Sequence, residues 1–195
     1  MKTISMDVDT LSRLIKFANL LALEFQEHGL TEKRGCYISI FSKETGVVLA
    51  TVFIGEIGEN NPLENIDFSE KAMQYRCFSI EKGERLFNDR IFNKDVSTSY
   101  DSRNTSKNKF AGAIAANELI YSCSGYNEDL DELMCLFLAY ENETYVCMDF
   151  QNTESREKVK FRPVQFFLEK LVDSKWSQLR AIASMLDKGL CEKVV

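Results

Sequence analysis

The sequence is poor in histidine, a residue that metal centres and hydrolytic sites commonly use. It has one histidine, His28, which excludes a histidine cluster and any Ser-His-Asp triad not centred on that residue. No stretch approaches the roughly 18 uninterrupted apolar residues that span a bilayer. The first ten residues lack a basic region followed by an apolar run. We therefore expect a cytoplasmic protein with no secretory signal and no membrane partner.

The cysteines are scattered through the chain and form no Cys-x-x-Cys pair. There are six of them: Cys36, Cys77, Cys123, Cys135, Cys147 and Cys191. Each has apolar or aromatic neighbours, and neither the paired spacing of a zinc site nor the short secreted chain of a disulfide framework is present. We expect buried, reduced thiols. Cys123 as a nucleophile would need a base and a lowered pKa, which no sequence neighbour supplies.

Charge is unevenly distributed along the chain. The net charge is −6, yet residues 154–195 hold nine Lys or Arg against six acids, which leaves −9 on residues 1–153. A body this acidic repels a phosphate backbone, so nucleic acid is not an expected partner. The basic segment can instead dock on an acidic surface, its own or that of a second subunit.

Hydrophobic periodicity predicts helices and hairpins in alternation over the first half. Apolar residues recur every three or four positions over 8–28, which is typical of an amphipathic helix. Strand formers over 36–41 and 47–54 predict a hairpin. A loop over 55–65 precedes a helix that Asp67 or Ser69 caps and that ends near Ile80.

The next part contains a segment without clear periodicity. Residues 82–109 are rich in Asn, Ser, Asp and Arg, and we expect a long exposed loop there. A second hairpin over 110–116 and 118–123 follows. Asn127 then opens an acid-rich helical turn. A rival interpretation makes 132–140 and 144–150 a hairpin.

The last segment predicts a helical extension. Pro163 suits the first turn of a helix, and apolar residues follow at helical spacing to about Lys188. We expect residues 1–153 to form one domain and 154–195 an extension packed on it or on a second subunit. The stripe over 163–188 is also a candidate docking segment for a protein partner.

This order of elements resembles the GlcG/HbpS-like superfamily over roughly residues 8–140. The likeness lies in Gly46–Ala50 leading to Ser69-Glu70-Lys71-Ala72, in Phe110–Ile114, and in Ser124-Gly125 followed six residues later by Asp131. The resemblance implies an α+β fold in α/β/α layers, with a central antiparallel sheet of about five strands flanked by helices in a profilin/roadblock-like layout. It also implies homo-oligomers and, in some members, bound haem.

Three residues are the candidate ligand-binding set. Ser124 and Gly125 can present backbone N–H groups to an anion, and Lys71 can reach a pocket from its helix. The plainer interpretation of Ser124-Gly125 is a tight turn with a cap, and that of Lys71 is a solvated charge. The acids of 127–132 can hold a cation, but their spacing is not that of a calcium loop.

His28 can serve as an axial ligand for haem, but a capping or solvent-facing role at the end of its helix is the plainer interpretation, and no motif marks it as the ligand of the family. The leading hypothesis is a non-enzymatic oligomeric domain that binds a small ligand such as haem, with no cofactor required and no catalytic residue assigned. The alternative is a protein-interaction scaffold of the profilin or roadblock kind that docks through its C-terminal helix. A third hypothesis is an enzyme that uses the Ser124-Gly125 turn.

Overall fold

Three helices and two β-hairpins alternate along the part of the chain that the structure describes. The computed structural model describes residues 6–27, 29–55, 70–116 and 118–143, all of which belong to one unit, Met1–Val146. The predicted loop beyond residue 55, the caps Asp67 and Ser69, the strand 144–150 and the extension 154–195 lie outside these ranges. In the described part, no helix is both long and apolar enough to cross a membrane.

Helix α1 (Val8–Glu27) confirms the first predicted helix, and both of its ends are capped. The carboxylate of Asp7 accepts the N–H of Thr10 at 2.6 Å and satisfies a free donor of the first turn. At the other end Gly29 has φ +66°, and the N–H of Leu30 donates to the carbonyl of Phe25. Glycine adopts this left-handed conformation without steric cost, so the chain can turn away from the helix there.

The sheet has four strands in the described part of the chain, against the five expected. Strands β1 (Gly35–Ser42) and β2 (Val48–Gly55) form the first predicted hairpin, and β3 (Ala113–Ala115) and β4 (Leu119–Ser124) form the second. Their order is β2-β1-β4-β3, and every neighbouring pair is antiparallel. The α+β class and the antiparallel sheet are thus confirmed.

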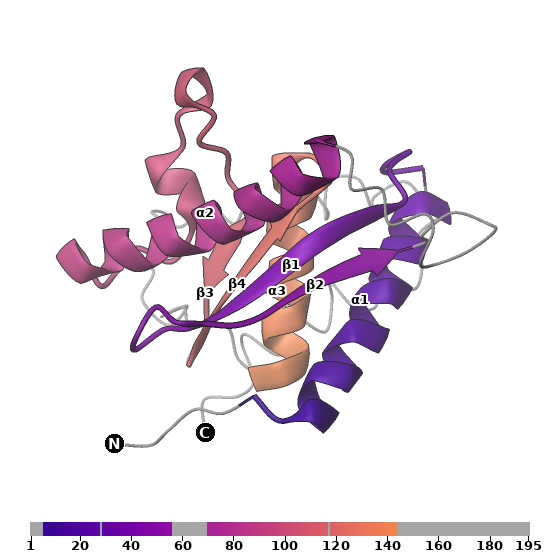
Figure 1. Cartoon of the computed structure of the whole chain (residues 1–195), viewed down its shortest axis with the longest axis horizontal. Coiled ribbons are helices and arrows are strands. Elements are labelled where there is room, and N and C mark those ends of the chain that lie inside the picture. Colours follow the sequence, from indigo (N-terminus) through magenta and orange to yellow (C-terminus); the bar gives the residue numbers. More distant parts are fainter. Residues whose placement is uncertain (1–5, 28, 56–69, 117, 144–195) are drawn as a thin grey trace, which may run out of the picture. The chain divides into compact units, whose positions relative to one another are not determined.

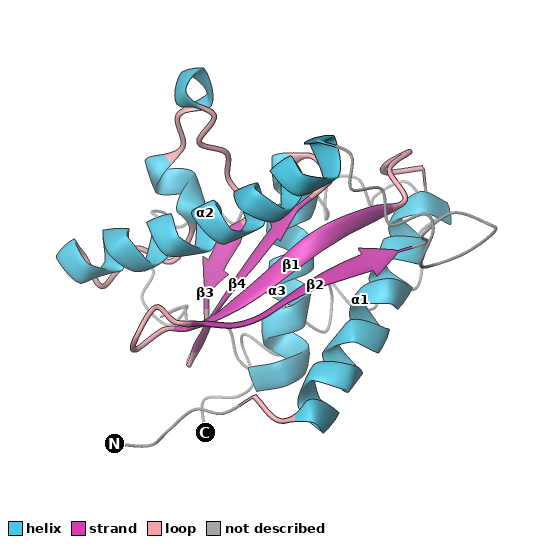
Figure 2. Cartoon of the chain, in the orientation of Figure 1, coloured by secondary structure: helices cyan, strands magenta, loops and turns pink. Residues whose placement is uncertain are grey.

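Helices cover both faces of this sheet. Helix α2 (Glu70–Phe92) packs on β1 and β4, while α3 (Glu128–Glu143) packs on β4 from the opposite face and α1 packs on β2 and α3 (Figure 1). Figure 2 shows the resulting helix, sheet and helix layers. Alternation along the strands explains the arrangement, because successive side chains enter opposite layers.

The prediction that α2 ends near Ile80 is wrong, and with it the exposed loop over 82–109. The helix continues to Phe92, and its last turns bury Lys82, Arg85 and Leu86. Because Lys82 and Arg85 are charged, the apolar pattern of the sequence stops at this point, although the helix continues. Of the loop expected over 82–109, only residues 93–109 are irregular, and they contain the short helices η1 (Ser99–Ser102) and η2 (Thr105–Lys107).

Helix α3 settles the choice between helix and hairpin after residue 127. The side-chain oxygen of Asn127 accepts the N–H of Leu130 at 2.9 Å, which is the expected cap of a helix that starts at Glu128. Residues 132–140 are therefore helical, and the rival hairpin is wrong.

Helix α2 approaches the sheet closely because small residues line the contact. The hydroxyl of Ser79 bonds to that of Ser39 on β1 at 2.9 Å, and the hydroxyl of Ser122 on β4 donates to the carbonyl of Ser79. One turn further on, a Cβ atom on Gly83 would lie 2.1 Å from the ring of Phe41. Phe41 is fully buried in the core, so its ring has little room to retreat.

We predict that Gly83→Ala destabilises the fold by about 1–3 kcal/mol, because overpacking against Phe41 outweighs the preference of a helix for alanine, which is worth about 1 kcal/mol. Urea unfolding measures the change. The neighbouring exposed residue provides the control, since Glu84→Ala should alter stability by less than about 0.5 kcal/mol. A more stable Gly83→Ala variant would show that α2 does not pack this closely.

Candidate functional site

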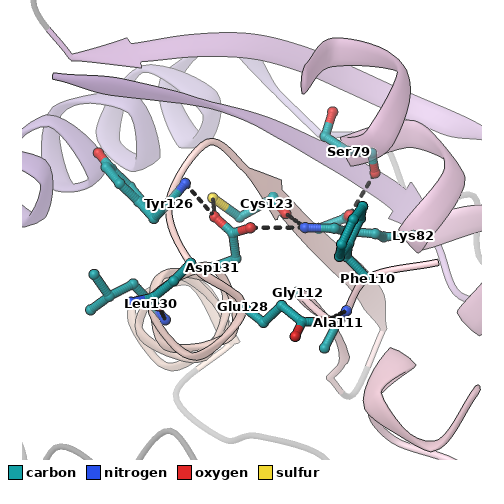
Figure 3. Close-up of polar contacts among 12 residues, drawn as sticks. Ser79, Lys82, Phe110, Ala111, Gly112, Cys123, Tyr126, Glu128, Leu130 and Asp131 are labelled. Atoms are coloured by element: carbon teal, nitrogen blue, oxygen red, sulfur yellow. Dashed lines mark hydrogen bonds and ion pairs between the residues drawn. The ribbon is translucent and has the colours of Figure 1, made fainter. Parts of the chain in front are cut away.

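A buried ion pair joins the two helical layers. Lys82 extends from α2 past the start of β3, and its Nζ lies 2.8 Å from Oδ2 of Asp131 on α3, across the sheet (Figure 3). The same ammonium donates to the carbonyl of Cys123 on β4 at 2.9 Å. The two charged side chains are only 2% and 3% exposed. One lysine thus bonds to the sheet and to the layer opposite its own helix.

Asp131 collects three donors from different elements. Besides Lys82, it accepts the backbone N–H of Tyr126 at 3.0 Å and the thiol of Cys123 at 3.5 Å, both through Oδ1. Burial raises the pKa of the Asp131 carboxyl, while the Lys82 ammonium and these hydrogen bonds oppose the shift. A buried carboxylate is costly unless it is paired and hydrogen-bonded, and here it is both.

Glycine at position 112 makes space for the pair. A Cβ atom there would lie 2.8 Å from the Nζ of Lys82 and 2.8 Å from the Cβ of Asp131. The φ of Gly112 is +127°, which side-chain-bearing residues rarely adopt. Its carbonyl accepts the N–H of Cys123 at 2.8 Å, so Gly112 extends the pairing of β3 with β4 by one hydrogen bond.

The structure places two of the three predicted ligand-binding residues beside this ion pair. Ser124 is the last residue of β4 and is buried, and Gly125 begins the turn that leads to α3. A Cβ atom on Gly125 would lie 2.6 Å from the Cα of Cys36, so glycine is needed for the close approach of β1. The backbone N–H of Tyr126, the residue after Gly125, donates to the carboxylate of Asp131, so the anion at this turn belongs to the chain itself. Binding of an external ligand by the turn stays a prediction.

Lys71 belongs to α2, but its side chain lies outside the described parts of the structure, as does His28. Two other lysines reach the residues on either side of the Ser124-Gly125 turn: Lys82 donates to the carbonyl of Cys123, and Lys33 donates to that of Tyr126 at 3.5 Å. Sequence reasoning missed Lys82 because it ended the helix too early. Spacings of three and four from Ser79 through Lys82 to Leu86 would have placed Lys82 on the inner face of a longer helix.

The four cysteines in the described ranges are mostly as expected, and Cys147 and Cys191 lie outside those ranges. Cys36, Cys77, Cys123 and Cys135 are free thiols, and all of them except Cys77 are buried. Cys77 is exposed on α2, which corrects its expected burial. Burial raises the pKa of the Cys123 and Cys135 thiols, and this disfavours the reactive thiolate. The geometry therefore gives no support to Cys123 as a nucleophile.

Three of the four acids at the start of α3, Glu128, Asp131 and Glu132, bond to other parts of the fold. Glu128 accepts Nε of Arg103 at 2.7 Å and the N–H of Ala111 at 2.6 Å. Burial acts to raise the pKa of Glu128, but these bonds leave it below its usual value. Glu132 accepts the hydroxyl of Thr98. Over the described residues, no group of three or more His, Cys, Asp and Glu could hold a metal ion.

Arg85 is the second buried cation, and it anchors the segment between α2 and β3. Its guanidinium pairs with Glu81 at 2.8 Å and donates to the carbonyls of Ser99 and Phe110 and to the hydroxyl of Ser102. The arginine fork suits several acceptors at fixed angles. The irregular segment is thereby tied to α2 at both of its ends.

Comparisons with known proteins give one similarity. No protein-family model and no curated protein sequence matches the chain. Among solved structures it is similar to Klebsiella pneumoniae protein ORFY, of the family DUF336, with 11% identity over 74% of this chain and 94% of that one, at a TM-score of 0.42. DUF336 is the GlcG-like family. A similarity of this size carries no information about a ligand or an assembly.

We predict that Lys82→Met destabilises the fold by about 3–5 kcal/mol, because it leaves a buried carboxylate without its cation. Urea unfolding of Lys82→Met, Asp131→Asn and the double variant forms a cycle in which the double variant loses clearly less than the two singles added together. Arg13→Met removes an exposed pair with Glu141 and should cost less than about 1 kcal/mol. Additive losses at positions 82 and 131 would show that the two side chains do not interact.

We also predict that Glu132→Gln stabilises the protein above neutral pH. Burial raises the pKa of Glu132 to about 7, although the Thr98 hydroxyl and the more distant Lys82 oppose the shift and Asp129 adds to it. The unfolded carboxyl ionises near its ordinary pKa of 4.5, so the native protein loses stability as the pH rises from about 4.5 to 7, by about 3 kcal/mol in all.

Glutamine keeps an acceptor for Thr98 and carries no charge. The variant should therefore exceed the native protein in stability at pH 8, and the difference should shrink towards pH 5, as measured by urea midpoints. Glu84→Gln, at an exposed position on α2, is the matched control and should show no such pH dependence. A pH-independent difference for Glu132→Gln would contradict the burial of an ionisable group at this site.

Proposed function

We propose that the chain is a non-enzymatic, homo-oligomeric domain of the GlcG/HbpS type that binds a small ligand, with haem as the candidate. One observation carries the proposal: the most deeply buried ion pair of the described fold, Lys82 with Asp131, is bonded within the fold itself. General acid–base and nucleophilic catalysis need ionisable groups within reach of a substrate. Here Lys82 and Asp131 are nearly fully buried and connect three elements of the fold.

The surface supplies the apolar area that a binding domain requires. Several large apolar side chains are exposed: Leu20 and Leu23 on α1, Val47 and Val48 at the first hairpin, Phe53 on β2, and Ile91 and Phe92 at the end of α2. Of these, the residues on α1 and β2 belong to elements that pack on each other, and exposed apolar residues that lie together are typical of binding sites. A mostly apolar, planar ligand fits such a surface better than it fits the interior.

The sequence contains one imidazole that can ligate haem iron. Haem iron accepts an imidazole nitrogen, and the sequence offers a single imidazole, that of His28, directly after α1. The exposed thiol of Cys77 is the competing candidate ligand. Bound haem would supply a coloured, redox-active group, while the chain would bind it and exclude water from it.

We predict that titration of the full chain with haem produces the sharp Soret band of a histidine-ligated complex. His28→Ala should lose this band, because no other imidazole exists in the sequence. Cys77→Ser removes the exposed thiol and should leave the band unchanged. A protein that does not alter the haem spectrum, or a band that survives in His28→Ala, would overturn the haem part of the proposal.

A further inference from the structure

The short strand β3 forms one edge of the described sheet, and the segment 97–99 covers that edge. The N–H of Ala115 donates to the carbonyl of Ser97 at 2.9 Å, and the N–H of Ala113 donates to the hydroxyl of Ser99 at 3.0 Å. The segment 97–99 therefore satisfies backbone donors that an uncovered edge strand would offer to another chain.

Two side chains hold this covering segment, one from each face of the sheet. From α2, the guanidinium of Arg85 donates to the carbonyl of Ser99 at 2.8 Å. From α3, on the opposite face (Figure 1), the carboxyl of Glu132 bonds to the hydroxyl of Thr98, a residue that also forms a bridge with Ile114 of β3. Arginine is not deprotonated in proteins, so the first of these attachments is independent of pH, whereas the second belongs to a group that titrates.

The carboxyl of Glu132 is buried without the compensation that its neighbour Asp131 receives. The two residues are 3% and 2% exposed. Asp131 accepts hydrogen bonds from the ammonium of Lys82 and from a backbone N–H, whereas Glu132 forms no ion pair within the described ranges and its donor there is one neutral hydroxyl. A carboxylate in such a place is costly, because one hydroxyl replaces only part of the hydration that burial removes.

The titratable groups around Glu132 do not remove this cost. They are Glu128, Asp129 and Cys135 on α3 and Lys82 on α2. Strand β3 contributes only alanine and isoleucine, and Arg103, which follows the covering segment, is paired with Glu128. Burial raises the pKa of Glu132 to about 7, with Asp129 and Glu128 adding to the shift and the Thr98 hydroxyl and Lys82 opposing it.

We infer that the Glu132 carboxyl is a pH-controlled clasp of the β3 edge: the protonated group keeps segment 97–99 closed on the strand, and the ionised group opens the segment so that water reaches the carboxylate. The opening is local, because Arg85 holds the segment at Ser99 and β3 keeps its pairing with β4. The inference concerns a movement of the domain and does not depend on its ligand.

Hydration, and not the hydrogen bond to Thr98, decides between the two positions. A hydroxyl accepts a hydrogen bond from a protonated carboxyl and donates one to an ionised carboxylate, so Thr98 bonds to Glu132 in both states. Only the ionised state gains strongly from water. Because the covering segment is irregular and short, its displacement admits water at a smaller loss of packing than a movement of α3 would.

The direction of the effect follows from the pKa of Glu132 in the two positions. In the closed position this pKa is about 7, and in an open, hydrated position it returns towards its ordinary value of 4.5. The closed position is therefore favoured fully below about pH 4.5 and loses ground as the pH rises to about 7. Between pH 6 and pH 8 the equilibrium constant for opening should rise about tenfold.

Hydrogen exchange of the full chain, followed residue by residue by NMR at pH 6 and pH 8, tests the inference. Ala113 and Ala115 donate their amides to the covering segment, so their protection factors, corrected for intrinsic rates, should fall about tenfold. The amide of Cys123 donates to the carbonyl of Gly112 within the sheet and reports global unfolding. The two alanine amides should exchange faster than that of Cys123 and should respond less to low concentrations of urea.

Glu132→Gln separates the clasp from a general effect of pH. Glutamine bonds to Thr98 without a charge, so the protection of Ala113 and Ala115 in this variant should change less than about twofold between the two pH values. Glu84→Gln, at an exposed position on α2, should keep the native tenfold fall.

Two results would overturn the inference. If the amides of Ala113 and Ala115 exchange only together with that of Cys123, with the same dependence on urea, ionisation of Glu132 destabilises the whole fold and opens no edge. If the tenfold fall persists in Glu132→Gln, another group controls the segment.

Discussion

A single buried lysine makes the three layers of this fold depend on one another. Lys82 starts in the helix on one face of the sheet and ends against a carboxylate of the helix on the other, with a strand carbonyl as its second acceptor. Removing either charge would leave the other unpaired in a dry interior, where the cost is several kcal/mol. Both helices and the β4 end are therefore fixed in position relative to one another.

The neighbouring structure follows from that constraint. Asp131 can face the sheet only because Gly112 has no side chain, and it holds the N–H of Tyr126 in the turn that leads into α3. Arg85, one turn after Lys82 on the same helix, fixes the segment that covers the β3 edge. The charges of Lys82, Asp131 and Arg85 are thus committed to the fold.

The sequence predicted the elements better than it predicted the site. Periodicity located α1 and both hairpins, because in each of them the apolar residues follow the period of the element. It left open whether a helix or a hairpin follows residue 127, and only the acids of the first turn favoured the helix that the structure shows. The same reasoning ended α2 twelve residues too early, since its inner face changes from apolar residues to Lys82 and Arg85. Their partners, Asp131 on α3 and the carbonyls of an irregular segment, come together only through tertiary contacts, which no local pattern encodes. The Ser124-Gly125 turn was predicted from the sequence, but the bond from the N–H of Tyr126 to Asp131 beside it was not.

The most direct measurement of the central claim is the NMR signal of the Lys82 ammonium group in the full chain at neutral pH, assigned by its loss in Lys82→Met. Buried and bonded to two acceptors, its protons should exchange slowly enough to be observed, and they should show cross-relaxation with the β-protons of Asp131 and the α-protons of Gly112. An ammonium signal that exchanges as fast as those of surface lysines, with no contact to Asp131, would contradict the claim that this side chain joins the layers.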